Sequence, residues 1–407
     1  MVNVAILGFG VVGSGTAEVL ASNQDIIEKR IGMKLQLKKI LDIRDFTGNP
    51  FASLITSQAD EVFEDDSISV VVETIGGAGI AYEFTKRALA KGKSVVTSNK
   101  ELVAKHGVEL MQLADHNHCA YLFEAAVGGG IPIIRPLRHC LAANEITQIT
   151  AIVNGTTNYI LTQMAENGAD FQTSLKSAQE KGYAEQNPSA DIDGIDAGRK
   201  LAILSTIALL GEYIDPDQIH TEGISAVTPE DIQYARHLDA KVKLLAIFRK
   251  DKSGNKRAIV APHILSRTVP VSVADNVFNA VMVYGNAVGE TLFYGQGAGK
   301  LATASAVVGD ILDAAVHMGR FSDMLAWYHT EDEVLCNYES NPVKALLRIP
   351  AKTDISAFLP AGNYRALENI IDGENAFIIG ENKTLTESEL QTIIANISEI
   401  NGMIRIY

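Results

Sequence analysis

Cysteine is scarce in this sequence of 407 residues. Its three cysteines, Cys119, Cys140 and Cys336, are odd in number and widely separated. A disulfide framework needs paired cysteines, usually in a short secreted chain, so we expect none here. We interpret the three residues as reduced cysteines of a cytosolic protein.

Long hydrophobic runs and positive charge are also in short supply. No apolar run reaches the roughly 18 residues that a membrane-spanning helix needs. The first residues, Met1–Gly8, do not show the basic stretch and longer apolar run of a signal peptide, so we expect a cytoplasmic protein. Lysine and arginine number 35 against 49 acidic residues, which gives a net charge of -14. Nucleic acids and anionic membranes are recognised by basic surfaces, so neither is an expected partner.

The first third of the chain alternates apolar runs with helical patterns. Val2–Leu7 is a continuous apolar run, as in a strand that is buried on both faces. Further strand-like runs are Leu37–Asp42, Val70–Thr74, Ser94–Ser98 and Ala120–Phe123, and helical patterns are Ile80–Ala90 and Glu101–Asn117. This alternation predicts βαβ units and a parallel sheet, so we expect an α/β fold with a Rossmann-type dinucleotide-binding domain over residues 1–127.

The character of the sequence changes near Gly128–Gly130. Strands are expected at Ile146–Val153, Val242–Arg249, Ala258–Ile264, Val281–Val283 and Glu290–Tyr294, and helices at Thr157–Glu166 and Asp193–Leu210. This pattern predicts an α+β domain with an open mixed sheet over residues 128–302. The helical run Thr303–Met318 is expected to pack back on the first domain and to complete it over about 303–325.

A small α+β unit is expected from about residue 330 to 407. Strands are predicted at Val343–Ile349, Ala376–Ile379 and Met403–Tyr407, with a helix at Ser388–Ile400. The chain shows no internal repeat and no low-complexity segment.

The turn after the first strand reads Gly8-Phe9-Gly10-Val11-Val12-Gly13, which fits the G-x-G-x-x-G pattern. Gly8 permits a tight turn, Gly10 lets the backbone approach a pyrophosphate, and Gly13 allows close packing of helix on strand. The helix that follows offers free N–H groups and a partial positive charge to phosphates. A glycine turn with only a structural role is the alternative, but the order of strand, turn and helix favours dinucleotide binding.

Cofactor preference is open at this point. Asp42, near the end of the second strand, could accept a hydrogen bond from a ribose 2′-OH and favour NAD. Arg44 could instead pair with a 2′-phosphate and favour NADP. The loop 46–50 beyond has no further basic residue.

A lysine and a group of carboxylates are the candidates for chemistry. Lys100 follows a predicted parallel strand at its carboxyl end, where ligands collect, although a solvated lysine is the alternative. Asp196 and Lys200 are four residues apart and share a face of the predicted helix, with Asp193 one turn earlier on a similar face. An exposed ion pair is the alternative. The surrounding residues are apolar, which predicts a buried helix, and a lysine beside carboxylates in a closed site can deliver and accept a proton.

Together these motifs resemble those of homoserine dehydrogenases. The resemblance rests on the glycine loop, Asn99-Lys100, and the run from Gly182-Tyr183-Ala184-Glu185 to Lys200. Three longer segments add to it, namely 124–132, 154–161 and 297–310. The resemblance covers about residues 1–325. It implies NAD(P)-dependent interconversion of L-homoserine and L-aspartate 4-semialdehyde, in the biosynthesis of threonine, methionine and isoleucine.

The resemblance also implies roles for individual residues. Lys200 is similar to the family's general acid/base, Lys100 to a lysine that contacts cofactor and substrate, and Asp196 to a carboxylate that orients the lysine or holds the substrate amino group. The implied substrate contacts are Glu185, Gly155, Thr156 and Asp191. The implied cofactor contacts are Gly8, Phe9, Gly10, Val11, Val12, Gly13, Arg44, Gly76 and Lys100. Glu124, Val127, Gly129 and Ile131 match a Na⁺ site built largely from main-chain carbonyls, for which a hinge without an ion is the alternative.

The sequence departs from the family pattern in two loops and in its last segment. The family usually reads A-E-P-D-P where this chain has Ala184–Pro188, and proline where it has Ala302, which affects loop rigidity more than chemistry. The last segment resembles the second half of an ACT regulatory module. The first half should carry a Pro-Gly turn that leads into a helix, and Ile349–Asp354 does not match it. We therefore expect a degenerate ACT-like domain with weak or absent threonine inhibition.

The resemblance implies a homo-oligomer, a dimer through the middle domain or a tetramer if the last segment also pairs.

Two other functions are considered. A semialdehyde dehydrogenase would use a thiolate near a histidine, for which Cys119 beside His118 and Cys140 beside His139 are the candidates, but both cysteines are interpreted as small core residues. A cofactor-binding regulator would lack the Lys200 group, which is present. A metal role for His116 and His118 is not expected, because no third ligand stands at usual spacing.

Overall fold

The computed structural model describes residues 1–318, 326–368 and 370–407. Contacts within the chain divide it into two compact units. Unit 1 comprises Met1–Glu145, Ala202–Pro216 and Phe293–Asp332, and unit 2 comprises Ile146–Leu201, Asp217–Leu292 and Glu333–Tyr407. Residues 319–325, the end of the segment expected to complete the first domain, lie outside the described residues. The three domain boundaries expected from the sequence stay a prediction.

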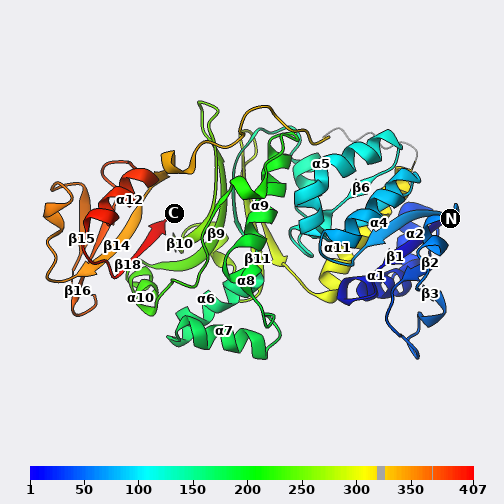
Figure 1. Cartoon of the computed structure of the whole chain (residues 1–407), viewed down its shortest axis with the longest axis horizontal. Coiled ribbons are helices and arrows are strands. Elements are labelled where there is room, and N and C mark those ends of the chain that lie inside the picture. The colour runs from blue at the N-terminus through cyan, green and yellow to red at the C-terminus, as the bar shows by residue number, and fades with distance from the viewer. Residues whose placement is uncertain (319–325, 369) are drawn as a thin grey trace. The chain divides into compact units, whose positions relative to one another are not determined.

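Unit 1 is built on a 6-stranded parallel sheet in the order β3-β2-β1-β4-β5-β6 (Figure 1). The strands are β1 (Val2–Leu7), β2 (Leu35–Leu41), β3 (Ile55–Thr56), β4 (Ile68–Glu73), β5 (Ser94–Thr97) and β6 (Tyr121–Leu122). The chain passes from β1 to one edge of the sheet and returns through β4 to the other. The strand order therefore reverses between β1 and β4, and ligands of such sheets bind at the carboxyl ends of the strands there. The predicted Rossmann-type fold is confirmed.

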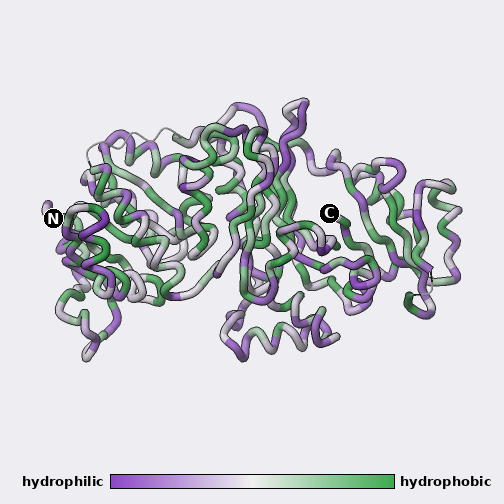
Figure 2. The backbone as a smooth tube through the Cα atoms, turned by 180° about the vertical axis from the view of Figure 1, so that it is seen from behind, coloured by the Kyte–Doolittle hydropathy of each residue, from purple (hydrophilic) through white to green (hydrophobic). Residues whose placement is uncertain are grey.

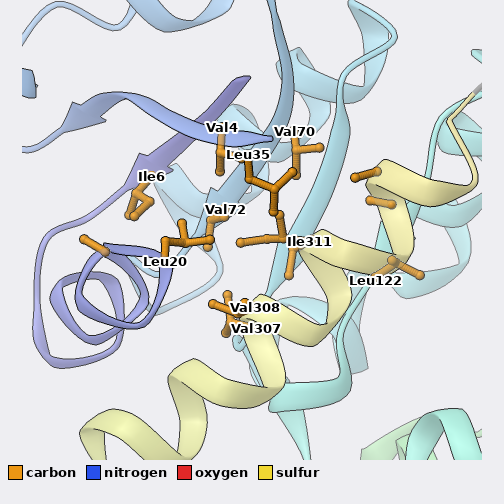
Figure 3. Packing of buried hydrophobic residues seen from close by; sticks show 14 of the residues in the cluster. Val4, Ile6, Leu20, Leu35, Val70, Val72, Leu122, Val307, Val308 and Ile311 are labelled. Atoms are coloured by element: carbon orange, nitrogen blue, oxygen red, sulfur yellow. The ribbon is translucent and has the colours of Figure 1, made fainter. Parts of the chain in front are cut away.

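Helices cover both faces of this sheet, as βαβ crossovers require. They are α1 (Val11–Ser22), α2 (Gln24–Ile31), α3 (Asp60–Phe63), α4 (Gly79–Ala90), α5 (Lys100–His116) and α11 (Lys300–Val316). Helix α11 comes from a distant part of the chain. Its Val307, Val308 and Ile311 join Leu20 of α1 and Val72 of β4 in one buried cluster (Figure 3). Each fully buried side chain of this kind stabilises the fold by about 1.5–3 kcal/mol, so α11 is an integral part of the sheet's core.

Unit 2 is built on a mixed 10-stranded sheet, with the path β12-β11-β7-β9-β10-β18-β14-β16-β15 and β8 paired to β10. The strands are β7 (Ile146–Ile152), β8 (His220–Thr221), β9 (Ala240–Lys250), β10 (Lys256–Ser266), β11 (Phe278–Gly285), β12 (Gly289–Gln296), β14 (Ala345–Pro350), β15 (Tyr364–Leu367), β16 (Glu374–Ile379) and β18 (Gly402–Ile406). Strands β13 (Pro342–Val343) and β17 (Leu385–Thr386) form a separate pair. The predicted mixed sheet is confirmed.

Strand β18 joins the middle and last segments of the chain into one sheet. It pairs in parallel with β10 and antiparallel with β14. The residues from Glu333 onward therefore share unit 2 with the middle of the chain.

The helices of unit 2 are α6 (Gly155–Asn167), α7 (Phe171–Glu180), α8 (Ser189–Ile192), α10 (Pro229–His237) and α12 (Glu387–Asn396). Helix α9 (Ile195–Ala208) belongs to unit 2 as far as Leu201, and the rest of it belongs to unit 1. The predicted start of the long helix at Asp193 was wrong. Asp193 is the C-cap of α8, and Gly194 has a φ of +83°, which ends that helix before α9 begins. Asp193 is therefore exposed and does not share a helix face with Asp196.

Hydrophobic residues follow the strands of both sheets, whereas hydrophilic residues dominate the outer loops (Figure 2). Among the described residues, no helix combines the length and apolarity needed to cross a membrane.

Candidate functional site

The glycine loop of unit 1 is held by tight packing. Gly8 has a φ of +87°, and its N–H donates to the Leu41 carbonyl at 2.9 Å. A Cβ on Gly13 would lie 2.0 Å from the Gly8 carbonyl oxygen. Only glycine can occupy these two positions without strain or a clash. The predicted roles of Gly8 and Gly13 therefore correspond to the local geometry.

The same loop leaves hydrogen-bond donors at the start of α1. Gly10 is the N-cap residue, no side chain caps the helix, and its first turn has no acidic residue. A Cβ on Gly10 would meet nothing closer than the Arg44 Nη2 atom at 4.0 Å, so the backbone is accessible. Val11 is 66% exposed, and Val12 is partly buried. Free N–H groups at an open helix N-terminus fit the pyrophosphate of a dinucleotide.

Asp42 supports this loop and a neighbouring arginine. Its Oδ2 atom accepts from the Phe9 N–H at 2.6 Å and from Arg44 Nη2 at 2.7 Å. Its Oδ1 atom accepts from the Arg44 backbone N–H at 2.9 Å and from Arg44 Nε at 3.0 Å. These bonds, chiefly those from the Arg44 side chain, hold the pKa of Asp42 well below its usual range. Four hydrogen bonds occupy the usual acceptor positions of a carboxylate.

A second buried carboxylate lies at the end of β4, and the sequence analysis missed it. Glu73 is fully buried, accepts from the Thr97 hydroxyl at 2.6 Å, and accepts from the Ile75 N–H at 2.7 Å. The Gly76 N–H lies 3.4 Å from the same carboxylate, and Gly76 has a φ of +86°. Burial raises the pKa of Glu73 even though these bonds oppose the shift. An acidic residue that ends an apolar strand just before two glycines was the available signal.

Thr97 connects the Glu73 carboxylate to the start of α5 through hydrogen bonds. The Asn99 backbone N–H donates to the Thr97 hydroxyl at 2.9 Å, and Asn99 Nδ2 donates to the Gly77 carbonyl at 2.6 Å. The Asn99 side chain also caps α5 by accepting from the Leu102 N–H at 3.1 Å. Lys100, partly buried, is the first residue of that helix. Glu73 therefore holds both Gly76 and the turn that carries Lys100.

Unit 2 holds the predicted lysine in a buried network. Lys200 on α9 is 8% exposed, and Asp196 is 3% exposed. Lys200 Nζ donates to Asp196 Oδ2 at 2.7 Å and to the Val153 carbonyl at 2.7 Å. Val153 directly follows β7, so the end of a central strand and the face of a helix meet at this ammonium. A buried charge with such partners is consistent with a functional role of the lysine and not with an ion pair on a solvated helix face.

Asn154 connects this network to a second carboxylate. Its Nδ2 donates to Asp196 Oδ2 at 2.9 Å and to Asp191 Oδ1 at 2.7 Å. Its Oδ1 accepts from the Thr157 N–H at 2.8 Å and caps α6. Asn154 had no role in the sequence analysis, although an asparagine before Gly155 at a helix start is a typical N-cap.

The remaining predicted substrate residues lie around this network. Gly155 is the first residue of α6, and a Cβ there would lie 3.1 Å from the Val277 carbonyl oxygen. The Thr156 hydroxyl donates to the Tyr183 carbonyl at 2.6 Å. Glu185, in the loop between α7 and α8, is exposed.

The predicted sodium ligands lie after β6. The Glu124 carboxylate accepts from the N–H groups of Ile133, Ile134 and Arg135 at 2.6, 2.8 and 2.7 Å. Glu124 can therefore offer an ion its main-chain carbonyl more readily than its side chain. Gly129 has a φ of +57°, and Val127 and Ile131 are buried. Within the described chain, no group of three or more His, Cys, Asp or Glu residues could hold a metal ion.

The cysteine alternative receives no support from the geometry. Cys119 is buried, its thiol donates weakly to the carbonyls of Leu89 and Ala114 at 3.7 and 3.6 Å, and burial raises the pKa of the thiol to about 12. A nucleophilic cysteine needs the opposite shift. Cys140 is exposed and was wrongly expected in the core.

Comparison with known proteins decides between the functions considered. The family model described as "Homoserine dehydrogenase, NAD binding domain" matches residues 8–124, and the model described as "Homoserine dehydrogenase" matches residues 132–312. The homoserine dehydrogenase of Neisseria gonorrhoeae is 43% identical over 317 residues, which are 77% of this chain and 72% of that protein.

The chain belongs to the homoserine dehydrogenase family. A solved homoserine dehydrogenase from Thiobacillus denitrificans has a TM-score of 0.90 and 36% identity, and covers 100% of this chain and 98% of its own. A hyperthermophilic archaeal homoserine dehydrogenase in complex with NADPH has a TM-score of 0.67 and 33% identity, and covers 79% of this chain and 99% of its own. Homoserine dehydrogenases are NAD(P)-dependent oxidoreductases that act on a CH–OH group, so the predicted enzyme class is confirmed.

We predict that Glu73→Gln weakens cofactor binding. An amide cannot accept all the hydrogen bonds that the buried carboxylate accepts, so the turn at Gly76 loses support. The cofactor KM should rise about tenfold, the equivalent of one lost buried hydrogen bond, with little change in the homoserine KM. Steady-state kinetics with each substrate varied in turn measures both values. Glu83→Gln, an exposed position on α4, is the control. An unchanged cofactor KM would remove Glu73 from this positioning role.

Proposed function

We propose that Lys200 moves the proton when this chain interconverts L-homoserine and L-aspartate 4-semialdehyde. One observation carries the proposal: the Lys200 ammonium is buried and held at 2.7 Å by both Asp196 and the Val153 carbonyl. Such fixed partners orient the N–H groups of a general acid and keep water from competing for them.

A bound nicotinamide dinucleotide supplies or accepts the hydride. In the direction of aldehyde reduction, Lys200 donates a proton to the oxygen that becomes the homoserine hydroxyl. In the opposite direction Lys200 accepts that proton. Asp196 supplies the negative charge that fixes the ammonium, and a positioned acid/base of this kind contributes about 10²–10⁴-fold to a rate.

The carboxylates near this lysine suit the substrate's own charge. The homoserine amino group is a cation, so Asp191 and Glu185 are proposed to hold it, with the loop of Gly155 and Thr156 beside them. Asn154 supports this role, because its bond at 2.7 Å fixes the carboxylate of Asp191. Lys100 is proposed to contact the cofactor and substrate from the start of α5.

NADP is the cofactor that the loop after β2 favours. Asp42 already accepts four hydrogen bonds from Phe9 and Arg44, so it has no free acceptor position for a ribose 2′-OH. Its bonds hold the Arg44 guanidinium, whose side chain is 57% exposed, beside the glycine loop. We propose that Arg44 pairs with a 2′-phosphate, and that Gly8–Gly13 and Gly76 contact the rest of the dinucleotide. The archaeal relative solved with NADPH is consistent with this choice.

We propose that Na⁺, a hard cation that prefers oxygen ligands, binds to the main-chain carbonyls of Glu124, Val127, Gly129 and Ile131. We also propose that the chain forms a homodimer, or a tetramer if the last segment pairs as well. Strand β12 supports self-association, because it is an edge strand and its Leu292, the last residue of this stretch of unit 2, is 37% exposed.

The segment from about residue 330 is proposed to be a degenerate ACT-like module. Between β14 and β15, where the pattern calls for a helix, the described residues form only the three-residue 3₁₀ turn Ile355–Ala357.

Replacing Lys200 should remove most of the chemistry and leave cofactor binding intact. Lys200→Met keeps the packing of the stem and removes the proton, so kcat should fall about 10²-fold or more. Absorbance of the reduced nicotinamide, with homoserine and NAD or NADP, follows turnover, and fluorescence titration follows cofactor binding. Lys176→Met, whose side chain is 78% exposed, is the matched control. A Lys200→Met rate near that of the parent protein would exclude Lys200 from this role. If the parent protein turned over homoserine with neither NAD nor NADP, the proposed activity itself would be wrong.

Arg44→Ala should change cofactor preference. Losing a charge-assisted bond to a phosphate should raise the KM for NADP about tenfold or more, because such bonds contribute about 1.5–3 kcal/mol. The KM for NAD should change little. Parallel assays with both cofactors give the ratio. Arg30→Ala, at an exposed position on α2, controls for a general loss of positive charge. Equal effects on NAD and NADP would contradict the assignment.

Threonine should inhibit this chain weakly or not at all. The 3₁₀ turn Ile355–Ala357 stands where the module would need a helix. A threonine titration of homoserine oxidation tests this expectation, with glycine as the control. Strong saturable inhibition by threonine would show that the last segment is a competent regulatory module.

A further inference from the structure

Unit 2 contains a cavity of about 90 Å³ that the proposed function does not use. Strands β9 and β10 line one side, and the last segment of the chain lines the other. Its polar lining consists of Arg249, Arg257, His263, Asn341, Lys344 and the Arg405–Glu387 pair. None of these residues belongs to the lysine network or to the glycine loop.

Two arginines face each other in this cavity. Arg249 of β9 and Arg257 of β10 are directly opposite in the antiparallel register. Like charges in this position repel each other and destabilise the pair of strands. One Nη of Arg257 pairs with Asp251 at 2.8 Å, but its buried Nε has no acceptor among the described residues. The guanidinium of Arg249, an exposed residue, lies 5.2 Å from the centre of the Tyr407 ring, and none of the described residues accepts a hydrogen bond from its side chain.

The cavity also contains a buried hydrogen-bond acceptor, the side-chain oxygen of Asn341. Asn341 is 7% exposed, and its buried Oδ1 receives no hydrogen bond from any residue that the structure describes. Buried amide oxygens are rarely left without a donor, because the loss of their hydration is then uncompensated. A donor from outside the chain would satisfy this oxygen.

The other charged groups of the cavity are already paired. Arg405 donates to Glu222 and Glu387 at 2.6 and 2.7 Å, and Lys344 pairs with Glu381 at 2.6 Å. His263 is hydrogen-bonded through Nδ1 to the Ala261 carbonyl at 2.8 Å, and burial lowers its pKa to about 4, so it is neutral. Among the described residues, the guanidinium groups of Arg249 and Arg257 and the Asn341 oxygen therefore remain for a ligand.

We propose that this cavity binds a phosphate group, either inorganic phosphate or a small phosphate monoester. The negative oxygens of the group accept from Arg249 and from Arg257 Nε, which removes the repulsion between the two arginines. A protonated oxygen of the same group donates to Asn341 Oδ1. Sulfate offers the negative oxygens without the proton, so it satisfies only the arginines. Because the lining comes from both the central sheet and the last segment, the bound group links the two.

Equilibrium dialysis with labelled inorganic phosphate tests the proposal on the full chain. Saturating NADP⁺ is included so that phosphate cannot report on the glycine loop or Arg44. One saturable site is expected, with sulfate as a weaker competitor at matched ionic strength. Glycerol 3-phosphate as a second competitor separates a site open to monoesters from one that takes only the free ion.

Two variants locate the site. Arg249→Gln should weaken phosphate binding about tenfold or more, the effect of one lost charge-assisted bond. Arg267→Gln is the control, because that arginine is 53% exposed, lies in the same unit and pairs with Asp239 outside the cavity. Without phosphate, Arg249→Gln should not lower the melting temperature, because it removes a repulsion. The absence of saturable binding, unchanged binding in Arg249→Gln, or sulfate binding as tight as phosphate would each overturn the proposal.

Discussion

One buried ammonium organises the chemical centre of unit 2. Lys200 Nζ lies within 2.7 Å of both Asp196 and the Val153 carbonyl, and Asn154 bonds to the same carboxylate. A charge removed from water must keep its partners, because the loss of one leaves the other uncompensated at a cost of about 3–5 kcal/mol. The end of β7 and the starts of α6 and α9 are therefore held together by one set of bonds. The apolar surroundings that bury the lysine also keep its donors fixed.

Much of unit 1 could be predicted because its signals are local. The apolar run of β1, the spacing of Gly8, Gly10 and Gly13, and the helix after them all lie within a few residues of one another. Parallel strands buried on both faces read as continuous hydrophobic runs, so their order along the chain already indicates a Rossmann-type sheet. Lys200 could be found for a similar reason, since Asp196 is four residues away on one helix.

The missed features depend on contacts between distant residues. Glu73 accepts a hydrogen bond from Thr97, and Asn154 donates one to Asp191. The residues of neither pair are close in sequence. Asp193 was misplaced because a single glycine with positive φ separates two helices inside an otherwise helical pattern. Arg348 and Arg405 are buried arginines that pair with residues far away in the sequence, Asp231 of α10 and Glu222 beside β8, in addition to nearer partners. Hydrophobic periodicity cannot indicate such pairs, because it reports burial and not the identity of the neighbour.

The position of β18 has a consequence for how unit 2 is made. This strand occupies the space between β10 and β14, although it is synthesised long after β10. Until residues 402–406 have left the ribosome, one edge of β10 lacks its parallel neighbour over His263 and Ile264. An unpaired edge of this kind is a site for pairing with other chains. Interrupted synthesis should therefore yield a fragment that aggregates through β10, so the final strand protects the nascent sheet as well as completing it.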